Sequence, residues 1–294
     1  MTGYREHGDG ANYAVHGYAS SGAGSVNTWW IETNNSIIVV DGQRQLSQAR
    51  EALAYIRRLH KPIAAIFISH EHPDHIGGLS VFRDAADPAV PLYGLRQTAR
   101  AIDDDERGYI ALARNVLDDD FPTQPLRPTV YITDGQQLDI DGVAITVHAF
   151  GAGEATANAT LLLDDGDFFA ADILTNEMIP FILEGRVSPW LAQLHHVKDL
   201  PVRRAYPGHG LGGDAQDITD TTLAYLTEFR DLVRDAVDGS GGLADDKRDA
   251  VAAEMQRRYP TWQPVADIPD MLAVSAAAIA DELAAEPPSS GTPT

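Results

Sequence analysis

Alternating hydrophobic and polar residues predict β-strands at the start of the chain. Three such segments lie at residues 13–18, 26–33 and 36–41. Asn34-Asn35, between the second and the third, is a residue pair that favours a hairpin turn. The sequence therefore predicts a small antiparallel sheet near the N-terminus.

A helical pattern follows. Residues 46–60 place hydrophobic side chains at intervals of three and four, which predicts an amphipathic helix that Pro62 ends. Residues 63–68 are almost entirely hydrophobic, as in a strand buried on both faces, and a second helix is expected from Ile76.

The second half of the chain repeats this alternation. Strands are predicted at 129–132, 143–150, 159–163, 167–170 and 202–206, with Asp-Gly turns between several of them and a helix at 189–198. From Asp217 the pattern is helical to about Tyr259, apart from a Gly-rich break at 239–242. Strands that alternate with helices predict an α/β fold with one main domain and a C-terminal helical extension.

The pattern also sets the expected domain boundaries. Residues 1–12 are expected to be a flexible N-terminus, and 13–216 to form the main domain. Residues 217–284 are expected to be a helical extension packed on that domain, either as a cover over its cleft or as the surface of a homodimer. The Pro/Ser/Gly-rich tail 285–294 is expected to be disordered.

The amino-acid composition indicates which classes of binding partner are expected. Asp and Glu number 43 against 22 Lys and Arg, which gives a net charge of -21, so nucleic acid and anionic membranes are disfavoured and a small-molecule substrate is expected. No hydrophobic run has the length of a membrane span, and the N-terminus lacks the pattern of a signal peptide, which predicts a cytoplasmic protein. The chain has no cysteine, so any metal must be held by His, Asp and Glu.

The strongest chemical signal comes directly after the hydrophobic strand at 63–68. His70, His72, Asp74 and His75 fall within six residues. A loop that leaves a buried strand can direct several side chains to one point, and imidazole with carboxylate suits zinc, manganese or iron. The alternative, a solvated His-rich turn, does not account for this spacing among only ten histidines.

With these residues in view, the sequence resembles the metallo-β-lactamase superfamily from about Val26 to Gly210. The resemblance rests on Val39-Val40-Asp41-Gly42, on the segment from Ser69 to Gly78, on Phe169-Ala170-Ala171-Asp172-Ile173-Leu174 and on Ala205-Tyr206-Pro207-Gly208-His209-Gly210. It implies a four-layer αβ/βα sandwich with two divalent metal ions, zinc being expected and manganese or iron the alternatives. It further implies that His70 and His72 bind the first metal, that Asp74, His75 and His209 bind the second, and that Asp172 bridges them.

One position departs from the family pattern. Where the family has a Pro-Gly-His-Thr-like turn, the chain reads Gly151-Ala152-Gly153-Glu154-Ala155, so Glu154 stands in place of the third histidine. Glu154 is interpreted as a ligand of the first metal. The alternatives are an acid/base group beside a weakly held metal, or a chain with one metal or none. A third carboxylate would make the cluster with its bridging hydroxide neutral, which favours harder ions such as manganese or iron.

The resemblance implies a hydrolase in which a metal-bridging hydroxide attacks the substrate, with Asp74 and Asp172 as catalytic residues. A small ester, lactone or amide-like substrate is the expectation, and Asn176 and Arg186 are candidate substrate contacts because they follow a ligand-bearing strand. An iron-dependent redox enzyme and a non-catalytic binding protein are the alternatives. Trp29-Trp30 is expected in the core, although alternation directs one of the two rings outward.

Overall fold

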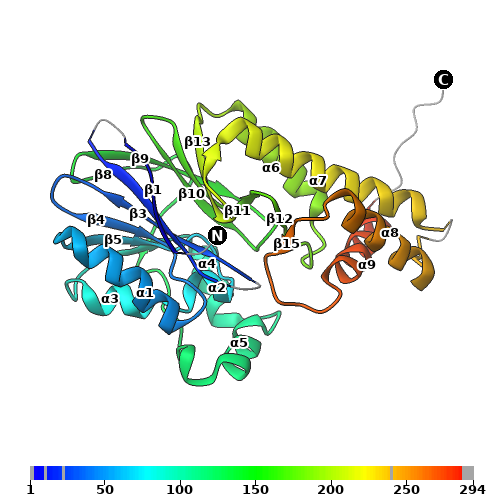
Figure 1. The fold of residues 1–294 in the computed structure, drawn as a ribbon, viewed down its shortest axis with the longest axis horizontal. Helices are drawn as coiled ribbons and strands as arrows, with labels where there is room; N and C mark the ends of the chain where they lie inside the picture. The colour runs from blue at the N-terminus through cyan, green and yellow to red at the C-terminus, as the bar shows by residue number, and fades with distance from the viewer. Residues whose placement is uncertain (1–2, 10–11, 22–23, 239–240, 287–294) are drawn as a thin grey trace.

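The computed structural model describes residues 3–9, 12–21, 24–238 and 241–286 (Figure 1). The first half of the chain builds a seven-stranded sheet whose strands follow one another in chain order. Strands β1 to β4 pair in antiparallel fashion and β4 to β7 in parallel fashion. The strands are β1 (Gly3–Asp9), β2 (Ala14–Ala19), β3 (Asn27–Glu32), β4 (Ile37–Val40), β5 (Ile63–Phe67), β6 (Leu92–Gly94) and β7 (Val130–Tyr131).

A second sheet of six strands follows, in the order β14-β13-β11-β10-β9-β8. Its pairs are antiparallel except β11 with β13, which are parallel. The strands are β8 (Gln137–Ile140), β9 (Val143–Phe150), β10 (Asn158–Leu163), β11 (Asp167–Thr175), β13 (Arg204–His209) and β14 (Gly213–Asp214).

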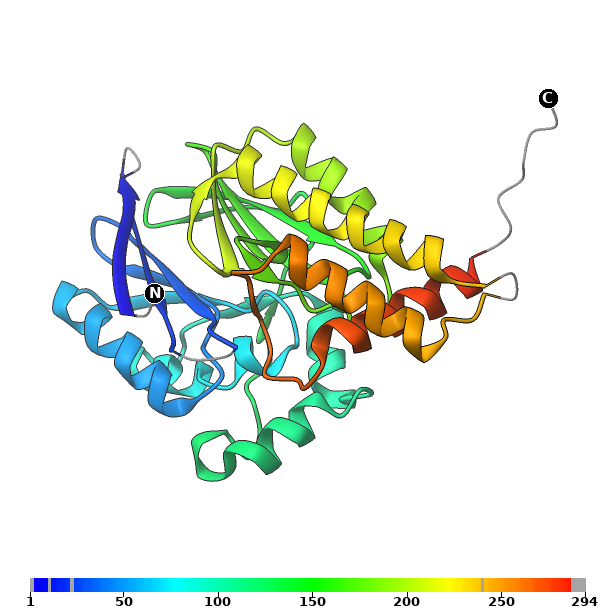
Figure 2. The same ribbon diagram turned by 45° about the vertical axis from the view of Figure 1, so that its right-hand side comes forward.

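Helices cover the outer face of each sheet (Figures 1 and 2). The first half contains α1 (Leu46–Ile56), η1 (Arg57–Leu59), α2 (Pro73–Ile76), α3 (Leu79–Ala85), α4 (Arg96–Asp104), α5 (Tyr109–Leu117) and η2 (Asp118–Asp120). The second half contains α6 (Val187–Asp199), α7 (Ala215–Ala236), α8 (Asp245–Arg258) and α9 (Met271–Ala285). No helix among these described residues is both long and apolar enough to cross a membrane.

Three hydrophobic clusters hold the layers together. One joins the first sheet to α1 and α3, one fills the space between the two sheets, and one joins the second sheet to α6, α7 and the C-terminal helices. The architecture is therefore the four-layer αβ/βα sandwich that the resemblance implied, with a helical extension at the C-terminal end.

Two local features add detail to the expectations: a strand near the N-terminus that was not predicted, and the burial of both rings of Trp29-Trp30, which confirms their place in the core. The segment expected to be a flexible N-terminus contains β1, which pairs with β2 along its length, because backbone pairing at a sheet edge needs no hydrophobic side chains. Alternation does send Trp29 and Trp30 to opposite faces, but both rings are buried, since the first sheet is covered on both sides. The predicted tail begins at Ala285, which is the last residue of α9, and its residues 287–294 lie outside the described residues.

The C-terminal extension is tied back to the main sandwich. A short strand, β15 (Gln263–Pro264), pairs with β12 (Met178–Ile179), and Val265 N donates a 3.1 Å hydrogen bond to Ile179 O. The segment between α8 and α9 is thereby held beside β12, the short strand that follows β11, and β11 carries Asp172. Its position matters for the site described next.

Candidate metal centre

The first group of predicted ligands leaves the end of β5. His70 and His72 lie on the loop after this strand, and α2 begins at Pro73, so that Asp74 and His75 lie in its first turn. The turn packs closely on the end of β4, where Gly42 N donates a 2.7 Å hydrogen bond to His75 O. A Cβ on Gly78 would lie 1.9 Å from Gly42 O, which explains why glycine is required there.

The remaining ligands come from the second sheet. Glu154 lies in the loop between β9 and β10, Asp172 on β11 and His209 at the end of β13. The pairing of β11 with β13 shifts register next to Ala171, whose φ of 47° turns the backbone immediately before Asp172. Gly208 leaves room for this carboxylate, because a Cβ there would lie 1.9 Å from Asp172 Oδ1.

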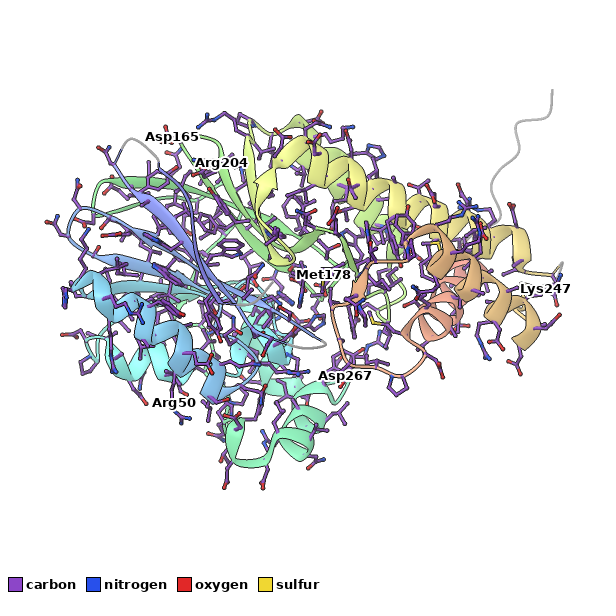
Figure 3. The ribbon with its side chains drawn as sticks, in the orientation of Figure 1. Arg50, Asp165, Met178, Arg204, Lys247 and Asp267 are labelled. Carbon is purple, nitrogen blue, oxygen red and sulfur yellow. The ribbon has the colours of Figure 1, made fainter. Side chains whose placement is uncertain are left out.

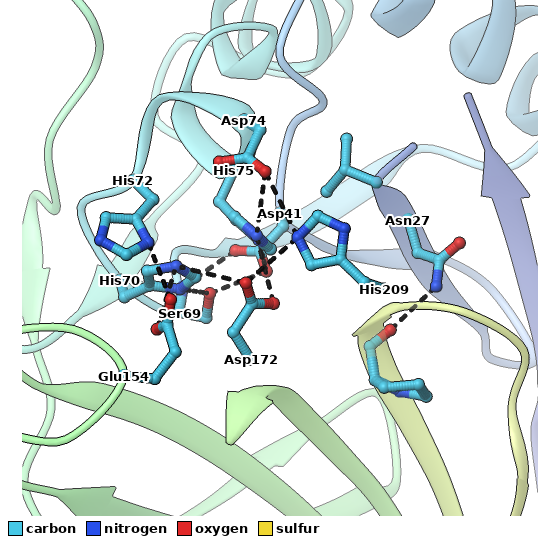
Figure 4. Close-up of polar contacts among 12 residues, drawn as sticks. Asn27, Asp41, Ser69, His70, His72, Asp74, His75, Glu154, Asp172 and His209 are labelled. Carbon is cyan, nitrogen blue, oxygen red and sulfur yellow. Dashed lines mark hydrogen bonds and ion pairs between the residues drawn. The ribbon is translucent and has the colours of Figure 1, made fainter. Parts of the chain in front are cut away.

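His70, His72, Glu154 and Asp172 form the first group of donors (Figure 4). His72 Nδ1 lies 2.9 Å from Glu154 Oε1, and His70 Nε2 lies 3.7 Å from Glu154 Oε2. His70 Nε2 also lies 4.0 Å from Asp172 Oδ2. Glu154 therefore faces both histidines, and its role as a metal ligand stays a prediction.

Asp74, His75 and His209 form the second group. His209 Nε2 lies 3.3 Å from Asp74 Oδ2, and His75 Nε2 lies 3.9 Å from the same oxygen. Asp172 is shared between the groups, since its Oδ1 lies 3.3 Å from His75 Nε2 and its Oδ2 lies 3.1 Å from His209 Nε2. The carboxylate is placed as a bridge between two cations would require.

Neighbouring groups orient three of the imidazole rings. Asp41 Oδ2 lies 2.9 Å from His75 Nδ1 and also accepts a 2.8 Å hydrogen bond from Ser69 Oγ. Ser69 Oγ lies 2.8 Å from His70 Nδ1, and the backbone carbonyl of Ser25 lies 2.6 Å from His209 Nδ1. Partners on the outer nitrogen leave Nε2 of all three rings free to coordinate a metal.

The cluster fits a pair of divalent cations. Several of its buried polar atoms contact one another as ion pairs but form no well-aligned hydrogen bond among the described residues, namely Nε2 of His70, His75 and His209, both carboxylate oxygens of Glu154, and Oδ1 of Asp172. Buried polar atoms without partners are costly, and imidazole with carboxylate is the donor set that zinc, manganese and iron share. Three carboxylates, of which Glu154 and Asp172 are buried, also require positive charge nearby.

The pKa values of several donors are raised, because the cluster holds several carboxylates close to its histidines. Burial raises the pKa of Glu154 to about 7, against the opposing effect of His72. Burial lowers the pKa of His72, but the adjacent Glu154 outweighs it and the pKa rises to about 9. His209 behaves alike: burial is outweighed by Asp172, and its pKa rises to about 10. Metal ions that bind here replace protons.

The two predicted substrate contacts lie differently from expectation. Asn176 Nδ2 donates a 2.8 Å hydrogen bond to Leu211 O, so this amide fixes the loop after His209 and is not among the residues that line the cavity at the metal donors. Arg186 lines a neighbouring polar cavity that includes His72, and its Nη2 lies 3.5 Å from Glu184.

A cavity of about 220 Å³ opens directly beside the donor atoms of the second group. His72, Asp74, Asp172 and His209 reach it, and its other walls come from α5, from Phe181 and from residues 265–268. Sequence reasoning missed these walls, because the exposed hydrophobic residues of α5 and the segment after Trp262 carry no motif. Asp41 was found only as part of a motif, not as the partner of His75.

A four-layer sandwich with histidine and carboxylate donors where its two sheets meet defines a metal-binding α/β protein. The model of the metallo-beta-lactamase superfamily matches residues 21–209. This is more than half of the chain, and the chain therefore belongs to the metallo-β-lactamase superfamily.

Individual relatives are distant. The chain is 26% identical over 196 residues to a probable metallo-hydrolase of Streptococcus pyogenes, a match that covers 63% of this chain and 78% of that protein. It is 24% identical over 198 residues to a hydroxyacylglutathione hydrolase of Methylobacillus flagellatus, covering 67% of this chain and 64% of the relative. A metallo-beta-lactamase family protein of Thermus thermophilus superimposes with a TM-score of 0.63 at 20% identity, over 87% of this chain and 88% of that one.

Proposed function

We propose that the protein is a hydrolase that uses two divalent metal ions to cleave a small ester, lactone or amide-like substrate. The observation that carries the proposal is the position of Asp172, whose carboxylate lies within about 4 Å of donor atoms in both groups. His70, His72 and Glu154 would hold the first ion, and Asp74, His75 and His209 the second.

When bound, the two ions supply Lewis acidity and a water molecule that is deprotonated at neutral pH. The residues of the chain hold the metal donors in position. Asp41 and Ser69 fix the rings of His75 and His70, and the bulge at Ala171 fixes Asp172. Asp74, whose side chain is 19% exposed, is the donor that faces the cavity and thus the approaching substrate.

The apolar walls of the cavity and the net charge of -21 support a small organic substrate over nucleic acid. The names of the two relatives, a probable metallo-hydrolase and a hydroxyacylglutathione hydrolase, support hydrolysis. Zinc is the proposed metal because four of the seven donors are imidazoles. Manganese and iron are the alternatives at the first site, because the carboxylate of Glu154 is a hard donor that suits these ions.

Elemental analysis of the unchelated protein, followed by an ester, lactone and amide panel, tests this function. We expect two equivalents of metal per chain and hydrolysis that a chelator abolishes and added metal restores. Absence of chelator-sensitive hydrolysis across the panel would count against the proposal.

Asp74→Ala is the decisive variant. Removing this carboxylate takes a donor from the second group at the cavity surface, so we expect no detectable turnover in a protein whose circular dichroism is unchanged. An Asp74→Ala protein with full activity would rule out this mechanism.

A redox function of the same site is the second candidate, and Glu154 is the observation that favours it, because a carboxylate donor suits iron. Iron as the bound metal, together with oxygen consumption in the presence of a thiol, would support this candidate. Zinc or manganese without oxygen consumption would exclude it.

A further inference from the structure

The cavity beside the metal donors has two walls that lie apart from the metal motifs. The first is α5, where Leu112 and Val116 line the cavity from adjacent turns. They are 59% and 71% exposed, the two highest values among the exposed large hydrophobic residues of the described chain. Two exposed apolar side chains, one helical turn apart at the mouth of a cavity, indicate a surface that binds an apolar group.

The second wall is the segment 265–268, from which Val265 and Ile268 line the same cavity. The pairing of β15 with β12 fixes this segment in place, and Phe181 also lines the cavity. Figure 3 labels Asp267 on this segment. The segment lies outside the family match at 21–209.

Arg44 supplies the positive charge in the lining. Its side chain is half-buried, and its Nε is buried with no hydrogen-bond partner within the described part of the chain. A guanidinium keeps its charge at every physiological pH, so a buried nitrogen of this kind calls for an acceptor. Asp267 lines the same cavity but is exposed and forms no ion pair with Arg44 in the described structure.

We propose that this cavity binds the hydrocarbon portion of an anionic ester, with the chain between α5 and segment 265–268 and the anionic group on Arg44. The scissile carbonyl then faces Asp74 and Asp172. The cavity volume of about 220 Å³ is the room available to this hydrocarbon chain. The proposal names the substrate class of the proposed hydrolase and rests on that function.

Three methyl esters test it: methyl acetate, methyl octanoate and monomethyl octanedioate, which adds a carboxylate at the far end of the same chain. We expect KM to fall at least about tenfold from methyl acetate to methyl octanoate, since each buried methylene contributes about 0.8 kcal/mol. Monomethyl octanedioate should have the lowest KM. Equal KM values for the short and long neutral esters would overturn the apolar part of the proposal.

Arg44→Met tests the charge, because methionine retains much of the side-chain length without the guanidinium. We expect KM for monomethyl octanedioate to rise about tenfold, with kcat and all values for methyl octanoate unchanged. Arg50→Met, at an exposed arginine of α1 outside the cavity lining, is the matched control and should change neither KM. An Arg44→Met variant that affects both eight-carbon esters equally, or neither, would overturn the role of Arg44.

Leu112→Ala tests the wall, and the exposure of Leu112 means that this change does not disturb the core. KM should rise for both eight-carbon esters and stay constant for methyl acetate. Calorimetric titration of monomethyl octanedioate into the protein, before and after chelation, separates this proposal from the proposed function. Binding that Arg44→Met weakens, without any hydrolysis, would uphold the cavity and reject the hydrolase; no binding in either state would reject the cavity.

Discussion

At the scale of single residues, Glu154 is the position that distinguishes this centre. Its carboxylate faces His70 and His72 at 3.7 and 2.9 Å, so that it takes the place of a neutral imidazole and adds one negative charge to the cluster. With three carboxylates among seven donors, the cluster is better matched to hard cations than a site with one more histidine would be.

Replacing Glu154 by histidine should therefore raise the zinc content of the first site, toward two equivalents of zinc per chain. The physical reason is that imidazole binds zinc more tightly than it binds manganese, and that the substitution removes the negative charge of Glu154, which favours harder ions. Metal content per chain, measured after growth in a defined mixture of metals, provides the readout.

Glu154→Gln is the matched control, since it keeps the shape and removes the charge. It should lower metal content at the first site without any gain of zinc. If Glu154→His leaves both the identity and the stoichiometry of the metals as they were, Glu154 is not a ligand.

The donors themselves could be predicted from sequence because they lie in short motifs, with four of them within six residues. Arg44, Leu112 and Ile268 could not, because the cavity that joins them forms only when distant segments pack together. The side-chain amide of Asn176, which follows β11, donates a hydrogen bond to Leu211 O, a contact that its sequence position did not indicate.

At the scale of secondary-structure elements, Asp41 joins the end of β4 to the beginning of α2. Its carboxylate accepts hydrogen bonds from Ser69 N at 2.9 Å and from Ser69 Oγ at 2.8 Å, and lies 2.9 Å from His75 Nδ1. One buried side chain thus fixes the loop that carries His70 and His72 as well as the ring of His75.

Asp41→Asn should weaken metal binding at the second site about 10–100-fold, since the amide supplies one acceptor where the carboxylate supplies two. Competition with a chromophoric chelator measures this affinity. The far-ultraviolet circular dichroism should remain that of the native protein. Unchanged affinity in Asp41→Asn would show that the orientation of His75 does not depend on this contact.

A second aspartate connects the two sheets at their turns. Asp141, between β8 and β9, accepts hydrogen bonds from Asn35 N and Asn35 Nδ2, both at 2.8 Å, and from Thr33 and Ser36 in the turn between β3 and β4. Hydrogen bonds from Thr33 and Asn35 hold the pKa of Asp141 well below its ordinary value.

The sign of the resulting pH dependence follows from that direction. Because the pKa is lower in the folded state, the stabilisation by Asp141 is complete above the unfolded value of about 3.9 and is lost as the pH falls through the folded value. Asp141→Asn should therefore lower Tm at pH 7, and the difference from the native protein should narrow below about pH 4. Thermal unfolding across this range measures it, with exposed Asp164→Asn as the control that should show no such gap.

At the scale of the whole molecule, the metals are expected to stabilise the fold as well as to serve chemistry. Both donor groups combine residues from the first sheet with residues from the second, so each ion would link the two halves of the sandwich. A ligand at about 1,000 times its Kd adds about 4 kcal/mol to the free energy of unfolding.

Chelation should accordingly lower Tm, by about 2–4 °C for each kcal/mol lost in a protein of this size class. Differential scanning calorimetry before and after chelation measures the change. In a His75→Ala/His209→Ala double variant, which lacks two donors of the second group, the shift should be smaller. A Tm that is independent of chelator in the native protein would show that the sandwich does not depend on its metals.

The global architecture could be predicted from sequence in outline. Alternating strand and helix patterns predicted an α/β chain, and the motifs implied the four-layer arrangement. The edge strand β1 was not predicted, because it is held by backbone pairing with β2 and not by a hydrophobic pattern that the sequence would show. The segment 265–268 was not predicted because its contact with β12 joins Ile179 to Val265, which are separated by about 85 residues of chain.

The strand order described above has a consequence for how the protein assembles. Each sheet is built from a continuous stretch of chain, and the chain passes only once from one sheet to the other, between β7 and β8. We therefore expect each half to gain its strands through short-range closures and the two halves to dock afterwards. Since neither half carries a complete donor group, the protein would bind a metal ion only after the two halves have docked. The rate of metal binding during refolding would therefore report the rate of docking.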